Sequence, residues 1–211
     1  MKVAVIIPAY NEERTIGDVV RVSTATSIVD EVIVVSDGST DLTASVAREH
    51  GARVIELQEN RGKGAAMKVG IDNCSADIIV FLDADLLGLE PRHIEAMVRP
   101  VVSGEAEMTV GIFGHGRFMT DLGQIVAPYL SGQRAVEKDV LEDLPDLEVA
   151  RFGVEIALNR HVRTCSIKVK EVTLDKVTHL MKEEKLGFWR GLRARLKMYW
   201  EIIKYLQKRR M

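Results

Sequence analysis

The sequence predicts an α/β protein in which helices flank a mostly parallel central sheet. Along the first half of the chain, short apolar runs typical of buried strands alternate with segments of helical spacing. Parallel strands need crossover connections, so this alternation favours a parallel sheet over a series of hairpins. The apolar runs lie at 2–8, 31–36, 53–57 and 77–82, and the segments of helical spacing include 42–50 and 65–73.

The pattern is less regular after Pro100, and the chain ends in a basic amphipathic stretch. We therefore divide the chain into one α/β domain, 1–186, and a C-terminal amphipathic helical tail, 187–211. In the second half we expect a strand at 107–113, a glycine-punctuated loop with a short helix at 114–132, a helix at 152–162 and a strand at 166–172.

The composition is that of an ordinary globular protein. Of 211 residues, 46% are hydrophobic and 28% are charged, which excludes a disordered or fibrous chain. The net charge of −2 lacks the basic excess of nucleic-acid binders, so no nucleic-acid partner is expected. Two well-separated cysteines indicate a reducing compartment, and neither a secretory leader nor a membrane-spanning run is evident. We expect a cytoplasmic protein.

Polar residues follow each of the first four predicted strands. The carboxyl ends of parallel strands meet at one rim of the sheet, where ligands of α/β proteins usually bind. We therefore expect these four loops to form a single site. They comprise residues 8–12, 36–41, 60–64 and 83–85.

Asp83 and Asp85 end the fourth apolar run and are separated by a single alanine. Two carboxylates on an open rim suit Mg2+ or Mn2+, whose remaining ligands are often substrate phosphates. The alternative is that both residues are merely solvated groups at the end of a strand. The pair by itself leaves both interpretations open.

Asp37 follows the second strand in the turn Ser-Asp-Gly-Ser-Thr-Asp. Its carboxylate can accept a hydrogen bond from a nucleotide base or ribose, as acidic residues do in other nucleotide-binding folds. The alternative is a plain strand-to-helix turn in which Ser39 or Thr40 caps the helix.

Arg61 and Lys63 alternate with two glycines immediately before a predicted helix. Free backbone amides and the helix dipole make such a position favourable for phosphate. The segment lacks the upstream glycine and the hydroxyl of a P-loop, and a solvated, capped loop is the alternative.

Together, these loops resemble the family 2 glycosyltransferases of the GT-A fold. Pro-Ala-Tyr-Asn-Glu, Asp-Gly-Ser-Thr-Asp, Asn-Arg-Gly-Lys-Gly and Asp-Ala-Asp occur in the family's order, although Ser36 stands where many relatives have an aspartate. The resemblance implies a Rossmann-like GT-A domain with a nucleotide-sugar half, 1–100, and an acceptor half, 101–186. It also implies roles for particular residues: Pro8, Ala9, Tyr10 and Glu12 line the nucleotide site, Asp37 contacts the base, Lys63 and Arg61 bind the donor, and Asp83 and Asp85 contact ribose and metal.

Two motifs of the second half are similar to acceptor-side motifs of the dolichyl-phosphate mannose synthase family. They are Ser-Gly-Gln-Arg at 131–134 and Phe-Gly-Val-Glu at 152–155. The resemblance implies that Gln133 binds substrate and that Arg134 clamps a phosphate with its planar guanidinium. Glu155 is the candidate acid-base group. The alternatives are a surface arginine and an ordinary helix carboxylate.

His179 follows the last predicted strand, and the resemblance to the wider GT-A fold implies a third metal ligand there. Imidazole binds manganese-like ions as well as zinc. The alternative for a lone histidine is a purely structural role.

The tail carries aromatic and aliphatic residues at intervals of three and four, with arginines and lysines between them. Such a helix can lie in the headgroup region of an anionic membrane. It can equally pack on the domain or on a second subunit. We expect either peripheral attachment to the inner membrane face or a homodimer.

The sequence therefore predicts a Mg2+- or Mn2+-dependent glycosyltransferase that uses a UDP-glucose or GDP-mannose type of donor and a phosphate-bearing acceptor. Polyprenyl phosphate is the favoured acceptor because its oxygen is already anionic. The alternatives are transfer to a soluble hydroxyl, as in the glucosyl-3-phosphoglycerate synthases that the chain distantly resembles, a nucleotidyltransferase, or a noncatalytic nucleotide-sugar sensor.

Overall fold

The structure is a computed structural model, and it describes residues 1–114, 131–142, 158, 161–162 and 164–180. The chain divides into a compact unit, Met1–Thr178, and a second unit, His179–Met211, of which only residues 179 and 180 are described. The predicted tail and most of the predicted helix at 152–162 therefore lie outside the described residues. Among the described helices, none is long and apolar enough to cross a membrane.

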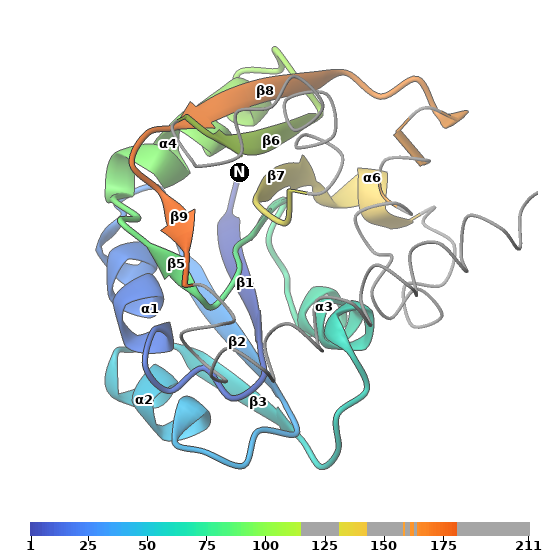
Figure 1. Cartoon of the computed structure of the whole chain (residues 1–211). Helices are drawn as coiled ribbons and strands as arrows, with labels where there is room; N and C mark the ends of the chain where they lie inside the picture. The colour runs from blue at the N-terminus through green and yellow to red at the C-terminus, as the bar shows by residue number, and fades with distance from the viewer. Residues whose placement is uncertain (115–130, 143–157, 159–160, 163, 181–211) are drawn as a thin grey trace, which may run out of the picture. The chain divides into compact units, whose positions relative to one another are not determined.

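A seven-stranded sheet in the order β3-β2-β1-β4-β7-β6-β8 forms the centre of the first unit (Figure 1). Strands β3, β2, β1 and β4 are parallel to one another. Strand β7 runs antiparallel to both β4 and β6, and β6 is parallel to β8. The strands are β1 (Val3–Ala9), β2 (Glu31–Asp37), β3 (Arg53–Leu57), β4 (Ile78–Phe81), β6 (Met108–Phe113), β7 (Arg134–Glu137) and β8 (Val169–Leu174). A two-stranded sheet pairs β5 (Leu86–Leu87) with β9 (Thr178–His179).

The prediction of a mostly parallel sheet flanked by helices is confirmed. The helices are α1 (Ile16–Ala25), α2 (Thr43–Glu49), α3 (Lys63–Asp72), α4 (Pro91–Val102) and α6 (Lys138–Glu142). Helices α1 and α2 lie on one side of the sheet and α3 lies on the other (Figure 1).

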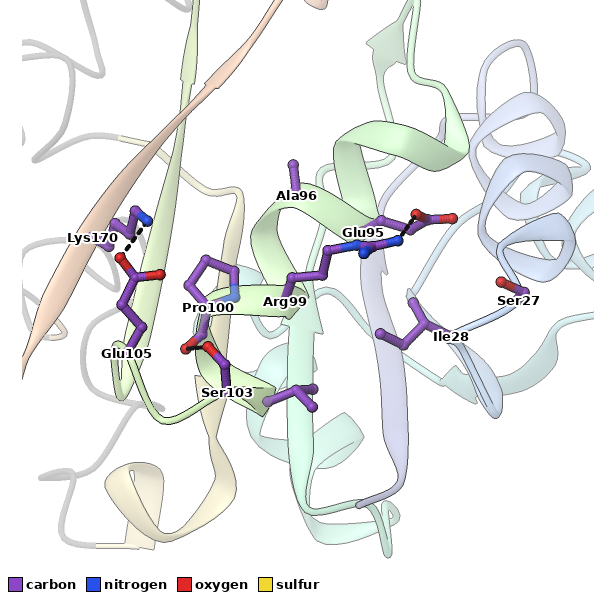
Figure 2. Close-up of a pocket in the computed structure, with 10 residues that line it drawn as sticks. Ser27, Ile28, Glu95, Ala96, Arg99, Pro100, Ser103, Glu105 and Lys170 are labelled. Atoms are coloured by element: carbon purple, nitrogen blue, oxygen red, sulfur yellow. Dashed lines mark hydrogen bonds and ion pairs between the residues drawn. The ribbon is translucent and has the colours of Figure 1, made fainter.

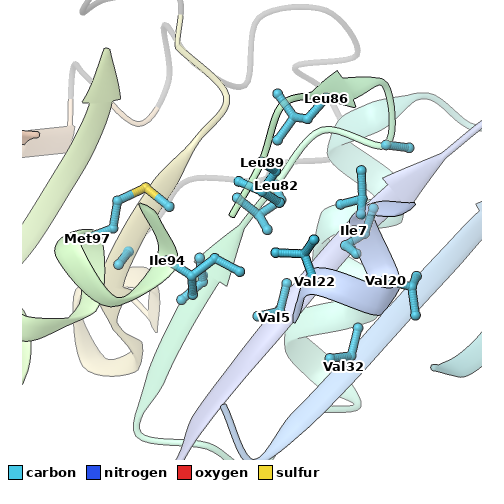
Figure 3. Packing of buried hydrophobic residues seen from close by; sticks show 14 of the residues in the cluster. Val5, Ile7, Val20, Val22, Val32, Leu82, Leu86, Leu89, Ile94 and Met97 are labelled. Atoms are coloured by element: carbon cyan, nitrogen blue, oxygen red, sulfur yellow. The ribbon is translucent and has the colours of Figure 1, made fainter. Parts of the chain in front are cut away.

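Strand β1 shows why its residues form a central strand. Val3, Val5 and Ile7 belong to the hydrophobic cluster that includes α1 and α4, whereas Ala4 and Ile6 belong to the cluster that includes α3. A strand with both faces covered has no polar alternation, which explains its continuous apolar run. Figure 3 shows the first of these clusters, with Val5 and Ile7 facing side chains of α1 and α4.

Pro8 lies within β1, although we expected the strand to end there. The carbonyl of Ile6 accepts a hydrogen bond from Leu82 just past the end of β4 at Phe81, and Pro8 faces the same side two residues later. Proline has no backbone N–H, but at Pro8 that group would point past the end of β4. No hydrogen bond between β1 and β4 is therefore lost. On the other side, the pairing with β2 continues to Ala9.

Helix α3 packs very closely on the sheet because its inner face carries small residues. A Cβ on Gly70 would lie 2.5 Å from Cγ2 of Ile6, so only glycine allows this approach. Gly64, Ala65 and Ala66 are also buried on this helix. The close packing fixes the first turn of α3, and with it Lys63, against the rim of the sheet.

Candidate functional site

The carboxyl ends of the parallel strands meet at one rim, as predicted, and a fifth segment joins them there. Because β7 is antiparallel to β4, Phe81 pairs with Arg134 and the residues just before β7 lie beside those just after β4. This places the Ser-Gly-Gln motif next to the Asp-Ala-Asp motif. No strand was predicted at β7, so this neighbourhood was not foreseen.

The carboxylate of Asp83 accepts hydrogen bonds on both of its oxygens. Nζ of Lys63 donates to Oδ1 at 2.7 Å, and Nε2 of Gln133 donates to Oδ2 at 2.7 Å. The side chains of Lys63 and Asp83 are only 29% and 19% exposed, so solvent screens their ion pair incompletely. Two charge-assisted bonds thus hold Asp83 in one orientation.

Gly132 packs directly against this ion pair. A Cβ built at Gly132 would lie 2.7 Å from Nζ of Lys63 and 2.7 Å from Oδ2 of Asp83. The backbone between Ser131 and Gln133 therefore closes over the pair without a side chain. Gly132 lies in the Ser-Gly-Gln-Arg motif, but the motif predicted no role of its own for this residue.

Asp83, Asp85 and His179 offer one ligand atom each, and these atoms lie within 4.8 Å of one another. Asp83 and Asp85 follow β4, and His179 is the last residue of β9, the strand paired with β5. Two carboxylates and one imidazole are a donor set that suits Mn2+ and, for the oxygens, Mg2+. The three residues predicted as metal ligands are therefore brought together and fit a divalent cation.

Asp37 is buried, with 3% exposure, and it holds the loop that precedes α3. Its two oxygens accept hydrogen bonds from the backbone N–H groups of Arg61 and Gly62, both at 2.8 Å. We expected these amides to favour phosphate, but the anion they bind here is the carboxylate of Asp37. A direct contact between Asp37 and a nucleotide base stays a prediction.

The same loop packs tightly on the turn after β2. Gly38 has a φ of 69°, and a Cβ there would lie 2.6 Å from the backbone nitrogen of Asn60. Both the left-handed conformation and the close approach require glycine. The glycine of the Asp-Gly motif thus lets the loops after β2 and β3 form one unit.

The loop after β1 is locked to the turn after β2 by Asn11, a residue that the sequence interpretation passed over. Asn11 has a φ of 55°, a conformation that asparagine tolerates better than most residues. Its Oδ1 accepts from the N–H of Thr40 at 2.8 Å, and its own N–H donates to Oγ of Ser39 at 3.1 Å.

The predicted nucleotide-site residues Pro8, Ala9, Tyr10 and Glu12 lie along this loop. The backbone N–H of Glu12 donates to Oγ1 of Thr43 at 2.8 Å, which adds a further tie to the neighbouring turn. Tyr10 is 47% exposed and so presents a ring to solvent at the rim. An exposed ring on a rigid loop can stack on a planar ligand.

Arg134 is buried, with 1% exposure, so the alternative of an ordinary surface arginine is wrong. Its Nε donates to the carbonyl oxygen of Ser131 at 3.1 Å. A buried guanidinium is costly unless hydrogen bonds or anions compensate its charge. Its role as a phosphate clamp stays a prediction. Glu155, the candidate acid-base group, lies outside the described residues.

A shallow depression on the surface lies apart from this site (Figure 2). It is bordered by α4 and the start of the segment leading to β6, and ion pairs join Glu95 to Arg99 and Glu105 to Lys170. None of the predicted site residues lines it. The chemistry of the rim, and not this depression, therefore identifies the functional site.

Comparison with known proteins agrees with the rim geometry. Residues 4–141 match the family described as glycosyl transferase family 2. Glucosyl-3-phosphoglycerate synthase of Mycobacterium tuberculosis is 32% identical over 194 residues, which cover 74% of this chain and 59% of that protein. Dodecaprenyl-phosphate galacturonate synthase of Rhizobium johnstonii is 30% identical over 197 residues, which cover 87% of this chain and 52% of that protein.

Solved structures of the Mycobacterium tuberculosis synthase have the same fold. Its complex with Mn2+, UDP-glucose and phosphoglyceric acid superposes with a TM-score of 0.71 at 30% identity, covering 85% of this chain and 72% of that one. Its complex with Mg2+ and UDP gives a TM-score of 0.72. The chain thus spans little more than half the length of the curated relatives it matches.

Proposed function

Because this chain belongs to glycosyl transferase family 2, we propose that it transfers a sugar from a UDP-linked donor to a phosphate-bearing acceptor, with the help of a divalent cation. The observation that carries the proposal is the convergence of Asp83, Asp85 and His179 beside Lys63 at the rim. The relatives bound to UDP together with Mn2+ or Mg2+ support both the donor base and the cofactor.

Asp85, Asp83 and His179 would hold the cation. A Mn2+ or Mg2+ ion bound there supplies Lewis-acid stabilisation of the negative charge on the leaving nucleoside diphosphate. The ammonium of Lys63, at the first position of α3, adds a positive charge beside the carboxylate of Asp83. Arg61 is exposed on the preceding loop, where it can reach a diphosphate.

The nucleoside would lie over the loops after β1 and β2. In this arrangement Pro8, Ala9, Tyr10 and Glu12 line its pocket from one loop, and Asp37 supports it from the other. The mutual hydrogen bonds of these loops preorganise the pocket, so little conformational freedom is lost on binding.

The acceptor would approach from the side of β7, and Arg134 would attract its phosphate. Glu155, which lies outside the described residues, is the candidate base. The acceptor oxygen attacks the anomeric carbon of the sugar, and the bond from that carbon to the diphosphate breaks. A hydroxyl acceptor must lose a proton in this step, whereas an acceptor phosphate is already anionic near neutral pH and requires no strong base.

Two acceptors merit direct comparison. A small phosphorylated acid such as 3-phosphoglycerate is favoured by the superposition on a relative holding phosphoglyceric acid. A polyprenyl phosphate is favoured by a relative whose match covers 87% of this chain, a dodecaprenyl-phosphate galacturonate synthase. Attachment to the inner membrane face through residues 187–211 belongs to the second candidate, and dimerisation through the same residues is compatible with the first.

The test is transfer of radiolabelled glucose from UDP-glucose, with Mn2+, to each acceptor in parallel, and with GDP-mannose as the alternative donor. Calorimetry of UDP with and without Mn2+ measures donor binding separately from turnover. A chain that binds UDP but never releases sugar would be a sensor, and release of pyrophosphate from a nucleoside triphosphate would indicate a nucleotidyltransferase. Either outcome would overturn the proposed activity.

A further inference from the structure

Gln133 is a buried amide whose hydrogen bonds link the acidic motif to a distant strand. Gln133 is 1% exposed, and its side chain is hydrogen-bonded to Asp83, which is 50 positions away in the sequence. A buried amide is costly unless its polar atoms are hydrogen-bonded, so its partners fix its position. The family resemblance assigned Gln133 to the substrate, but these contacts point elsewhere.

The orientation of the amide follows from the chemistry of its partners. A carboxylate can only accept, so the NH2 group of Gln133 must face Asp83, where Nε2 lies 2.7 Å from Oδ2. The Oε1 atom then lies 3.1 Å from the hydroxyl oxygen of Ser131, whose single proton is shared between this atom and the nearer carbonyl of Gly111. The donor end of the amide is therefore directed at Asp83.

Ser131 and the backbone connect this amide to β6. The Oγ of Ser131 donates to the carbonyl of Gly111 at 2.6 Å, and the N–H of Gly111 donates to the carbonyl of Gln133 at 2.9 Å. Gly111 in turn lies so close to Gln133 that a Cβ there would be 3.1 Å from the Cβ of Gln133. These contacts tie the backbone and the Cβ of Gln133 to β6.

We propose that Gln133 is a positioning residue that holds Asp83 in its functional orientation, opposite Lys63, and does not itself bind the substrate. Lys63 donates a hydrogen bond to one carboxylate oxygen of Asp83 and Gln133 donates to the other. Two donors from different parts of the chain therefore set the plane of the carboxylate. This inference deepens the proposed function and rests on it for the identity of the ligand.

The first variant is Gln133→Met, which keeps the volume and removes the donor. We expect the affinity for UDP in the presence of Mn2+ to fall about tenfold or more, the effect of losing one hydrogen bond to a charged group. Thr109→Val is the matched control, because Thr109 is fully buried in β6 and donates to the carbonyl of Met97 at 2.8 Å without touching the site. That control should lose stability but keep the wild-type affinity.

A double-mutant cycle separates positioning from direct binding. In an Asp83→Ala background, Gln133→Met should have almost no further effect on UDP affinity, because the residue acts only through Asp83. An equal loss in both backgrounds would mean that Gln133 contacts the donor itself, and this would overturn the inference. Wild-type affinity in the Gln133→Met single variant would overturn it as well.

Two further arms keep the test decisive. If Gln133→Met fails to fold, Gln133→Glu preserves size and polarity but puts a second carboxylate opposite Asp83, and it should show the same loss. If the wild type itself does not bind UDP with Mn2+, the proposed function fails independently of this inference. Crystal structures of the wild type and the variant then test whether Gln133 positions Asp83. An Asp83 carboxylate that keeps its orientation without Gln133 would refute the positioning role.

Discussion

At the scale of single residues, Asp83 and Asp85 are both half-buried and belong to one group of candidate metal ligands. Asp83 is held on both oxygens by Lys63 and Gln133, as its two bonds of 2.7 Å show. Asp85 shares the ligand group with Asp83 and His179. We therefore expect Asp85 to bind the cation directly, together with Asp83 and His179.

Replacing Asp85 by alanine should abolish the Mn2+ dependence of UDP binding, because the cation loses a charged ligand. The fold should survive, since Asp85 is only half-buried in a loop. Isothermal calorimetry of UDP with and without Mn2+ measures the effect. Asp72→Ala, which removes an exposed carboxylate paired with Lys68 on α3, is the control. Retained Mn2+ dependence in the Asp85 variant would contradict the assignment.

At the scale of elements, the loop that begins α3 depends on a carboxylate from another strand. Asp37, at the end of β2, accepts from the N–H groups of Arg61 and Gly62, which places Lys63 at the rim. The helix can therefore present its lysine to Asp83 only while Asp37 holds the loop. A change at Asp37 should act on the site through this loop even without a direct contact to the nucleotide.

Asp37→Ala should weaken UDP binding at least tenfold, corresponding to about 1.5–3 kcal/mol for the loss of a charged hydrogen bond. Titration of UDP by calorimetry checks the value. Asp30→Ala is the matched control, because Asp30 makes the same kind of bond, 2.8 Å to the N–H of Val3, far from the rim at the start of β1. Normal affinity in the Asp37 variant would reduce its role to turn formation.

Helix α4 begins with a reciprocal cap whose strength depends on pH. The N–H of Glu90 donates to Nδ1 of His93 at 3.0 Å, and His93 is almost fully buried. Burial, and next the charge of Arg92, lower the pKa of His93 from its usual value of 6.5. The unfolded chain therefore binds this proton more readily than the folded chain, so stability is lost as the pH falls below about 6.5.

His93→Gln should remove part of this acid sensitivity, because glutamine at the same helix position still accepts from the N-cap N–H but carries no titratable proton. Urea unfolding at pH 7.5 and pH 5.5 gives the measurement. The wild type should lose more of its free energy of unfolding between these two pH values than the variant. An equal loss in both proteins would show that other groups dominate.

At the scale of the whole molecule, the basic residues of 187–211 offer a test of the acceptor class. If residues 187–211 bind an anionic surface, each basic residue near that surface adds about 1 kcal/mol of attraction. Full-length protein should then float with phosphatidylglycerol vesicles at low salt and detach as salt is raised. Absence of flotation would favour the soluble phosphate acceptor and a role of the tail in the fold or in a dimer.

A chain truncated after residue 186 gives the complementary measurement. It should keep its affinity for UDP with Mn2+, because every described residue of the donor site lies before that point. Its transfer to polyprenyl phosphate in vesicles should fall, whereas transfer to 3-phosphoglycerate should be unchanged. Loss of folding on truncation, detected by circular dichroism, would instead identify the tail as a structural part of the domain.

The sequence by itself determined the parallel half of the sheet and the four rim loops. The patterns behind these predictions are local: apolar runs such as that of β1, and motifs such as the Asp-Gly turn at Asp37, express themselves within a few residues. The resemblance to a glycosyltransferase family supplied the metal ligands, including His179 far along the chain, and the structure brings them together.

Only the tertiary structure decided what lies beside Asp83. No local pattern states that β7 runs antiparallel next to β4, yet that pairing brings Gln133 and Gly132 against the Lys63–Asp83 pair. Likewise, the amides before α3 look like a phosphate site in sequence but are bound by Asp37 from a neighbouring strand. Partners of a buried charge are set by how distant strands pack, because the low-dielectric interior requires every such charge to be matched wherever the fold places it.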